Sequence, residues 1–276
     1  MNCIDLGGHS GCKIFLMEFD DGRNFVRKIS KDKDYNSRLQ VQCDKQKKYI
    51  GSKIKAPKVF RSGMTEEDLF FFDMEYIQGI TLAEYIRNIE IGKIKGLVDA
   101  LVENIDKEIY FEKNEANTIF RKKFYDLQSK LAGNNMVIDE ALNLLKLHDW
   151  SRFSRSFCHG DMTLENIIVR NDQLYFIDFL DSFYDSFLMD LGTLLQDVQV
   201  MWSYRKDKNV DMNLILRLIV FRDLLLDSIC KKDESLVKEM YFALLQKLVR
   251  ILPYTNDNIT WNFLIEKIKL VIKEVV

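Results

Sequence analysis

Two short apolar runs near the middle of the chain constrain the fold most strongly. They cover residues 167–169 and 174–177, and the four polar residues 170–173 between them have Asn and Asp at their centre. This pattern is typical of a β-hairpin. Asn166 precedes the first run and Asp178 follows the second. Because the start of one hairpin strand lies beside the end of the other, we expect these two side chains to be neighbours.

A possible catalytic group precedes the hairpin. The sequence His159-Gly160-Asp161 places a carboxylate five positions before Asn166. Mg²⁺ accepts a few protein oxygens and fills its other positions with water and substrate phosphates, so Asn166 and Asp178 fit as metal ligands. Asp161 is left to accept a proton. Each residue alone has an ordinary interpretation as a turn or a strand cap, but their joint spacing predicts phosphate chemistry.

This segment resembles a known family. Residues 159–166, followed by Ile177-Asp178-Phe179, are similar to the catalytic loop and metal-binding aspartate of the protein-kinase-like superfamily. The His-Gly-Asp form resembles the aminoglycoside phosphotransferase and choline kinase branch, since protein kinases have His-Arg-Asp and Asp-Phe-Gly. Here no glycine follows Phe179. The resemblance implies Mg²⁺ and a nucleoside triphosphate as phosphoryl donor.

The resemblance also implies the fold. We expect an α+β, protein-kinase-like two-lobe fold with a small antiparallel-sheet N-lobe and a larger, mainly helical C-lobe. The strand-like pattern of residues 1–76 corresponds to the N-lobe, which would bind nucleotide. Residues 77–276 have helical periodicity and correspond to the C-lobe, with the catalytic loop and the acceptor site.

Glycines near the N-terminus suggest a phosphate-binding turn. Backbone N–H groups can approach phosphates closely where glycine has no side chain in the way. By the resemblance, we expect nucleotide contacts from Gly7, Gly8, Ser10 and Gly11. An ordinary hairpin turn would also explain these glycines.

Lys28 lies within the apolar strand that follows this turn. In the family, a lysine at this place holds the nucleotide phosphates, and a glutamate from the next helix pairs with it. The helix predicted over residues 35–50 contains no glutamate. Gln42, Asp44 and Gln46 are the candidates for the partner of Lys28, and we place Gln42 nearest.

The apolar run 69–74 continues into Glu75, Tyr76 and Ile77 and resembles the segment that links the two lobes. In the family its backbone reads the adenine edge, so Glu75 and Ile77 are the predicted nucleotide contacts. Backbone contacts have no side-chain signature, and ATP and GTP both remain possible donors.

Several residues of the predicted C-lobe are candidates for supporting the catalytic loop or contacting the acceptor. By resemblance, Asp190 supports the catalytic loop through hydrogen bonds rather than taking part in the chemistry. Some acidic and aromatic residues could contact the acceptor, although aromatic residues in amphipathic helices are usually packing groups. They are Asp181, Asp185, Trp202, Tyr204 and Trp261.

Composition excludes several other classes of protein. Of 276 residues, 30% are charged and the formal net charge is −2, so no basic surface indicates a nucleic-acid partner. The most apolar stretch, residues 212–229, contains four charged side chains and does not predict a membrane span. Five scattered cysteines and an N-terminus without a signal-peptide pattern favour the cytoplasm. The oligomeric state is left open.

These observations predict a Mg²⁺-dependent small-molecule kinase with Asp161 as catalytic base. The acceptor would be a hydroxyl of a sugar, an amino alcohol or an aminoglycoside. Protein kinase activity is disfavoured because no Ala-Pro-Glu element follows Asp178. A non-catalytic, kinase-like nucleotide-binding module is the alternative, suggested by the missing helix glutamate.

Overall fold

The computed structural model describes residues 2–8, 11–105 and 115–276. Ser10, one of the predicted nucleotide contacts, lies outside the described residues. The chain divides into two compact units, one formed by Met1–Leu82 with Asn166–Asp181 and the other by Ala83–Glu165 with Ser182–Val276. The lobe boundary placed after Tyr76 stays a prediction. Each unit is described by itself.

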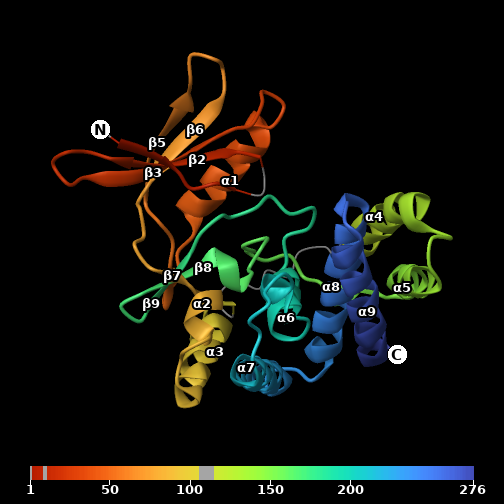
Figure 1. Cartoon of the computed structure of the whole chain (residues 1–276). Helices are drawn as coiled ribbons and strands as arrows, with labels where there is room; N and C mark the ends of the chain where they lie inside the picture. Colours follow the sequence, from red (N-terminus) through yellow and green to blue (C-terminus); the bar gives the residue numbers. More distant parts are fainter. Residues whose placement is uncertain (1, 9–10, 106–114) are drawn as a thin grey trace. The chain divides into compact units, whose positions relative to one another are not determined.

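The first unit is built on a five-stranded antiparallel sheet (Figure 1). The central strand β3 pairs with β2 on one side and β6 on the other, with Lys28 opposite Ile14 and Phe72. Side chains alternate between the two faces of a strand, so Lys28 shares the buried face of β3 with Val26. In spatial order, the strands are β1 (Asn2–Asp5), β2 (Lys13–Glu18), β3 (Asn24–Ile29), β6 (Phe70–Met74) and β5 (Val59–Met64).

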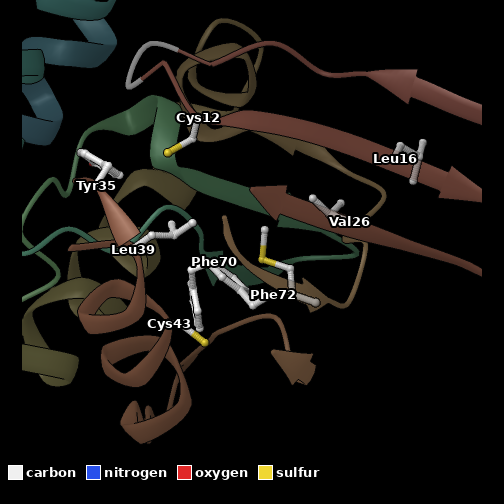
Figure 2. Packing of buried hydrophobic residues seen from close by; sticks show 9 residues of the cluster. Cys12, Leu16, Val26, Tyr35, Leu39, Cys43, Phe70 and Phe72 are labelled. Carbon is white, nitrogen blue, oxygen red and sulfur yellow. The ribbon is translucent and has the colours of Figure 1, made fainter. Parts of the chain in front are cut away.

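Helix α1 (Asn36–Lys48) contributes the other half of this core. Its buried residues are Leu39, Gln42, Cys43 and Gln46, which recur at the spacing of one helix face. Figure 2 shows Leu39 and Cys43 beside Phe70 and Phe72 of the sheet. Fully burying a leucine or phenylalanine side chain stabilises the fold by about 1.5–3 kcal/mol. The same packing places Gln42 on the buried side of α1.

A second sheet contains the predicted hairpin. Strands β8 (Ile167–Arg170) and β9 (Gln173–Phe176) pair antiparallel around the two-residue loop Asn171-Asp172. Both loop residues have positive φ angles, of 49° and 61°, as a type I′ turn requires. Strands β4 (Ile54–Lys55) and β7 (Ile80–Thr81) complete the order β4-β9-β8-β7. The hairpin is therefore confirmed, with a tighter turn than the sequence pattern indicated.

The second unit is mainly helical, as the sequence predicts (Figure 1). Helix α6 is buried along its whole length, and α8 packs against it. A Cβ at Gly192 of α6 would lie only 2.6 Å from the Cβ of Ala243 in α8, so glycine is required for this close approach. The helices are α2 (Leu82–Ile86), where the division falls, α3 (Ile91–Ile105), α4 (Ala116–Leu131), α5 (Met136–Leu147), α6 (Phe187–Val198), α7 (Met212–Cys230), α8 (Ser235–Ile251) and α9 (Asn258–Val275).

Across the described ranges, no helix combines the length and the apolar character needed to cross a bilayer. This includes α7, which covers the most apolar stretch of the sequence. The antiparallel sheet followed by a mainly helical remainder confirms the predicted fold class.

Candidate active site

In the first unit, Lys28 is buried and has two side-chain partners. Its Nζ donates to Oε1 of Gln42 at 3.2 Å and forms an ion pair with Oδ1 of Asp178. Gln42 also donates through Nε2 to the Tyr35 hydroxyl at 3.1 Å and to Asp181 Oδ1 at 3.3 Å. A neutral amide therefore contacts Lys28 from α1, and the opposite charge beside Lys28 comes from Asp178.

Asn166 and Asp178 lie at neighbouring ends of the hairpin. The N–H of Ile177 donates to the carbonyl oxygen of Asn166 at 3.0 Å, which extends the strand pairing by one step. Asp178 has a φ of 60°, in the left-handed region that few non-glycine residues adopt. Phe179 is buried against Tyr49 and Phe176. This packing fixes the chain after Asp178. The side chain of Asp178 itself is 35% exposed.

The residues after Asp178 are fixed to α1. Arg38 donates to both carboxylate oxygens of Asp181, at 2.8 and 3.1 Å, and Lys45 donates to the Leu180 carbonyl at 2.8 Å. Asp181 was a candidate acceptor contact, but in this structure it pairs with Arg38 and Gln42 within the first unit. It helps to position α1 relative to the end of the hairpin.

The predicted phosphate-binding turn has glycine at two strained positions. Gly7 and Gly11 have φ angles of 69° and 78°, which favour glycine. The Gly7 N–H donates to Asp5 Oδ1 at 2.8 Å, and a Cβ at Gly8 would lie 3.1 Å from the Ile14 side chain. The backbone thus requires glycine at Gly7 and Gly11 and leaves little room at Gly8.

The other predicted nucleotide contacts follow β6. Glu75 donates its N–H to the Lys58 carbonyl at 2.9 Å, and Ile77 is buried. Their roles toward a nucleotide stay predictions.

In the second unit, the loop that contains Asp161 is fixed by Asp190 in the first turn of α6. The buried Asp190 carboxylate accepts hydrogen bonds from the backbone N–H of His159 at 2.6 Å and of Gly160 at 2.9 Å. The Cys158 thiol donates to the same carboxylate at 3.3 Å. Gly160 has a φ of 94°, so glycine is needed there. Side-chain contacts therefore fix the backbone just before Asp161.

Sequence reasoning missed Asp197, which holds the end of the same loop. Its Oδ2 accepts the N–H of Leu164 at 2.6 Å, and its Oδ1 accepts the N–H and hydroxyl of Ser203 at 2.8 and 2.7 Å. Complete burial raises the pKa of Asp197 to about 6, and these hydrogen bonds oppose the shift. The available signal was its spacing, two helical turns after Asp190 on the same face of α6.

The comparison with family models decides the identity. Residues 49–216 match the model described as the phosphotransferase enzyme family. The chain belongs to this family. The matched segment includes Asp161, Asn166, Asp178 and Asp190, and ends before α8. The protein is therefore a phosphotransferase. A comparison of the sequence with curated proteins gave no match.

Solved structures of kinase-like proteins share the fold of this phosphotransferase. A thermostable mutant of aminoglycoside phosphotransferase APH(4)-Ia, in ternary complex with AMP-PNP and hygromycin B, has a TM-score of 0.66 at 14% identity, covering 99% of this chain and 93% of that one. A choline/ethanolamine kinase family protein from Mesorhizobium loti has a TM-score of 0.55 at 15% identity, covering 100% and 90%. At these identities the similarity shows the fold alone.

The donor atoms at the hairpin end of this phosphotransferase suit Mg²⁺. Asn166 and Asp178 offer an amide and a carboxylate oxygen, the hard ligands that Mg²⁺ prefers. The hydrogen bond recorded for Asp178 among the described residues uses Oδ1, so Oδ2 is available to a cation. In the described ranges, no three acidic, histidine or cysteine side chains form a metal-binding group.

Two aromatic candidates for the acceptor contact have packing contacts within the second unit of this phosphotransferase. Tyr204 is buried and donates its hydroxyl to the Ala83 carbonyl at 2.7 Å, and burial raises its pKa. Trp202 lies under the guanidinium of Arg205, 3.9 Å from the ring centroid. These contacts support the helical unit itself, as the packing interpretation of such aromatic residues predicts.

Proposed function

We propose that this phosphotransferase moves the terminal phosphoryl group of ATP or GTP to a hydroxyl of a small molecule, with Asp161 as catalytic base and Mg²⁺ bound by Asn166 and Asp178. The observation that carries the proposal is the fixed loop around Asp161. Asp190 and Asp197 hold its backbone at both ends through buried hydrogen bonds. A base held in this way is oriented before the acceptor binds, which favours proton transfer.

Each step follows from a named group. Asp161 orients the acceptor hydroxyl and takes its proton as the oxygen attacks the terminal phosphorus. An oxygen–phosphorus bond forms, the bond from that phosphorus to the bridging oxygen breaks, and the nucleoside diphosphate leaves. When bound, Mg²⁺ supplies charge neutralisation for the phosphate oxygens.

Lys28 would position the phosphates. Its ion pair with Asp178 and its hydrogen bond with Gln42 hold the ammonium group in place within the first unit. Phosphates would compete with the Asp178 carboxylate for this ammonium. Gln42 can orient Lys28 but adds no negative charge, so it does not oppose the approach of the nucleotide.

The similar structures indicate which acceptor classes to test first. They include an aminoglycoside phosphotransferase bound to hygromycin B and a choline/ethanolamine kinase family protein. A third similar structure, from Thermobifida fusca, is assigned as a fructosamine-3-kinase, with 12% identity and a TM-score of 0.59, covering 99% of this chain and 94% of that one. A sugar, an amino alcohol and an aminoglycoside are therefore the starting panel.

The proposal is tested by incubating the purified chain with Mg²⁺, ATP or GTP, and a panel of hydroxyl acceptors. The expected result is an acceptor whose mass increases by one phosphoryl group. Asp161→Asn should lower kcat by about 10²- to 10⁴-fold, because it removes the proton acceptor but keeps the side-chain size. Glu140→Gln, at an exposed position of α5, is the matched control and should leave kcat unchanged.

Two results would contradict the proposal. Asp161→Asn with the turnover of the parent would exclude Asp161 as the base. Mg²⁺-dependent thermal stabilisation by ATP or GTP, without transfer to any acceptor, would favour the non-catalytic nucleotide-binding module. The alternative function is suggested by Gln42, a neutral side chain, as the helix partner of Lys28.

A further inference from the structure

A lysine from the C-terminal helices lies beside the loop that contains Asp161. Lys247 of α8 is partly buried, and its Nζ donates to the carbonyl oxygen of Gly160 at 3.0 Å. Gly160 is the residue directly before Asp161. The close approach of Gly192 and Ala243 brings α8 against α6, and Ala243 lies about one turn before Lys247. The position of the ammonium group is thus set by helix packing.

Lys247 lacks the kind of partner that a buried cation usually has. In the parts of the chain that are described, its recorded hydrogen-bond partner is a neutral carbonyl, and no carboxylate forms an ion pair with Nζ within 4.0 Å. Burial lowers the pKa of Lys247, the Asp161 carboxylate opposes this shift, and Arg250 adds to it. Lys28, in contrast, is paired with Asp178. An ammonium has three N–H donors, and those not used by Gly160 can serve a ligand.

A second cation lies on the same face of α8, next to a cavity whose lining does not include Lys247. Arg250 lies three positions after Lys247 on α8, at the spacing of one helix face. Its guanidinium carbon lies 4.9 Å from the ring centroid of Phe183. Arg250 also lines a cavity of about 290 Å³ together with Lys123 and Lys130 of α4. Asp126 is the one acidic residue in that lining, so three cations face one carboxylate.

We infer that the acceptor of this phosphotransferase carries an anionic group, a carboxylate or a phosphate, which Lys247 binds while the acceptor hydroxyl meets Asp161. This inference rests on the proposed function and defines its substrate class. An anion would supply the charge that the partly buried ammonium lacks. A polycation or a quaternary amine would bring like charge toward Lys247 and Arg250, and is disfavoured.

The experiment uses matched acceptors that differ in charge. Glucose, gluconate and glucose 6-phosphate form one set, and glycerol, glycerate and glycerol 2-phosphate form another. Choline and hygromycin B represent cations. The full chain, with Mg²⁺ and ATP, is assayed for kcat and KM with each compound. We expect an anionic member to have the highest kcat/KM, and the carboxylate and phosphate arms distinguish the two kinds of anion.

Variants of Lys247 separate charge recognition from support of the loop. Lys247→Gln should raise KM for the anionic acceptor by about 10- to 100-fold, the loss of one charge-assisted hydrogen bond, with little change in KM for ATP. Lys247→Arg should restore part of the affinity. Lys238→Gln removes an exposed lysine of the same helix and should match the parent.

Other results would overturn the inference. If Lys247 served only the loop backbone or the transferred phosphoryl group, Lys247→Gln would lower kcat equally for every acceptor. Preference for glucose, glycerol, choline or hygromycin B over the anionic compounds would also exclude it, while leaving the proposed function intact. If no compound is phosphorylated, the proposed function fails on this panel. Calorimetric titration with gluconate and glucose 6-phosphate then decides the inference, and equal affinity for the parent and Lys247→Gln would exclude it.

Discussion

The loop around Asp161 and the hairpin end around Asp178 are held by different kinds of contact. In the loop, the buried carboxylates of Asp190 and Asp197 accept backbone N–H groups. At the hairpin end, side chains pair with side chains, as in the Lys28–Asp178 ion pair. Backbone hydrogen bonds to buried carboxylates fix geometry, whereas a partly exposed ion pair can exchange partners. The proposed base is therefore held in place before a ligand binds. The side chains proposed to bind metal and phosphate, Asp178 and Lys28, can exchange their ion pair for contacts with a ligand.

The largest effect should come from breaking the support of the loop. Asp190→Ala leaves the N–H groups of His159 and Gly160 buried without an acceptor, which costs about 2–6 kcal/mol of unfolding free energy. Turnover should fall by about 10²-fold in the molecules that remain folded, because a displacement of Asp161 by an ångström is enough. Urea unfolding, together with kcat measured at a temperature where the variant is folded, checks both effects.

Asp190→Asn is the matched variant for this prediction. It keeps one acceptor oxygen and should lose less stability than Asp190→Ala. If Asp190→Ala kept the stability and turnover of the parent, the loop would not depend on α6, and the contrast with the hairpin end would disappear.

A smaller effect on the free energy of unfolding is expected from the protonation of Asp197 as pH changes. Its folded-state pKa, about 6, lies above the ordinary value of 3.8, so the folded state binds the proton more tightly than the unfolded state. The free energy of unfolding should therefore fall as pH rises from about 4 to 6, by roughly 1–3 kcal/mol from this group. Denaturant unfolding at pH 4.5, 5.5 and 7 measures the slope.

Asp197→Asn isolates this contribution from that of every other titrating group. The variant should be less stable at every pH, but its stability should decline less between pH 4 and 6. Parallel curves for the parent and the variant would show that Asp197 does not titrate in this window.

The smallest effect should come from the hairpin side. Gln42→Glu places a carboxylate beside Lys28 and close to Asp181. We expect a change of less than about 10-fold in KM for the nucleotide, because the new attraction to Lys28 is offset by repulsion from Asp178 and Asp181. Steady-state kinetics with varied ATP measures this change, and Gln40→Glu, at an exposed position of the same helix, is the control. A loss of turnover comparable to that of Asp190→Ala would show that the hairpin end is as rigid as the loop.

Local patterns made parts of this structure predictable. The hairpin was predicted because apolar runs and turn residues are encoded over a dozen neighbouring positions. The turn was tighter than expected because Arg170 and Gln173 pair with each other although both are polar. Gln42 could be placed near Lys28 from its distance along the chain to the strand expected at residues 56–59, and the hydrogen bond between the two side chains agrees with that placement.

The contacts that sequence reasoning missed depend on tertiary packing. Asp197 shares a face of α6 with Asp190, but its hydrogen bonds to Leu164 and Ser203 come from packing that this spacing does not specify. Lys247 reaches Gly160 from α8, 87 positions along the chain, and its residue type alone does not distinguish it from other lysines. Such contacts are set by how α6 and α8 pack, which periodicity does not specify.

The close approach at Gly192 has a consequence for how this enzyme family could diversify. Lys247 reaches the loop from α8, which lies against α6 with no side chain between the two helices at Gly192. A larger residue at this crossing would shift α8 and withdraw the ammonium group, while Asp190, on α6 itself, would keep its contacts with the loop. Under the role inferred for Lys247, a substitution at Gly192 would change the preference between acceptors from a position distant from Asp161, while the contacts of Asp190 with the loop remain.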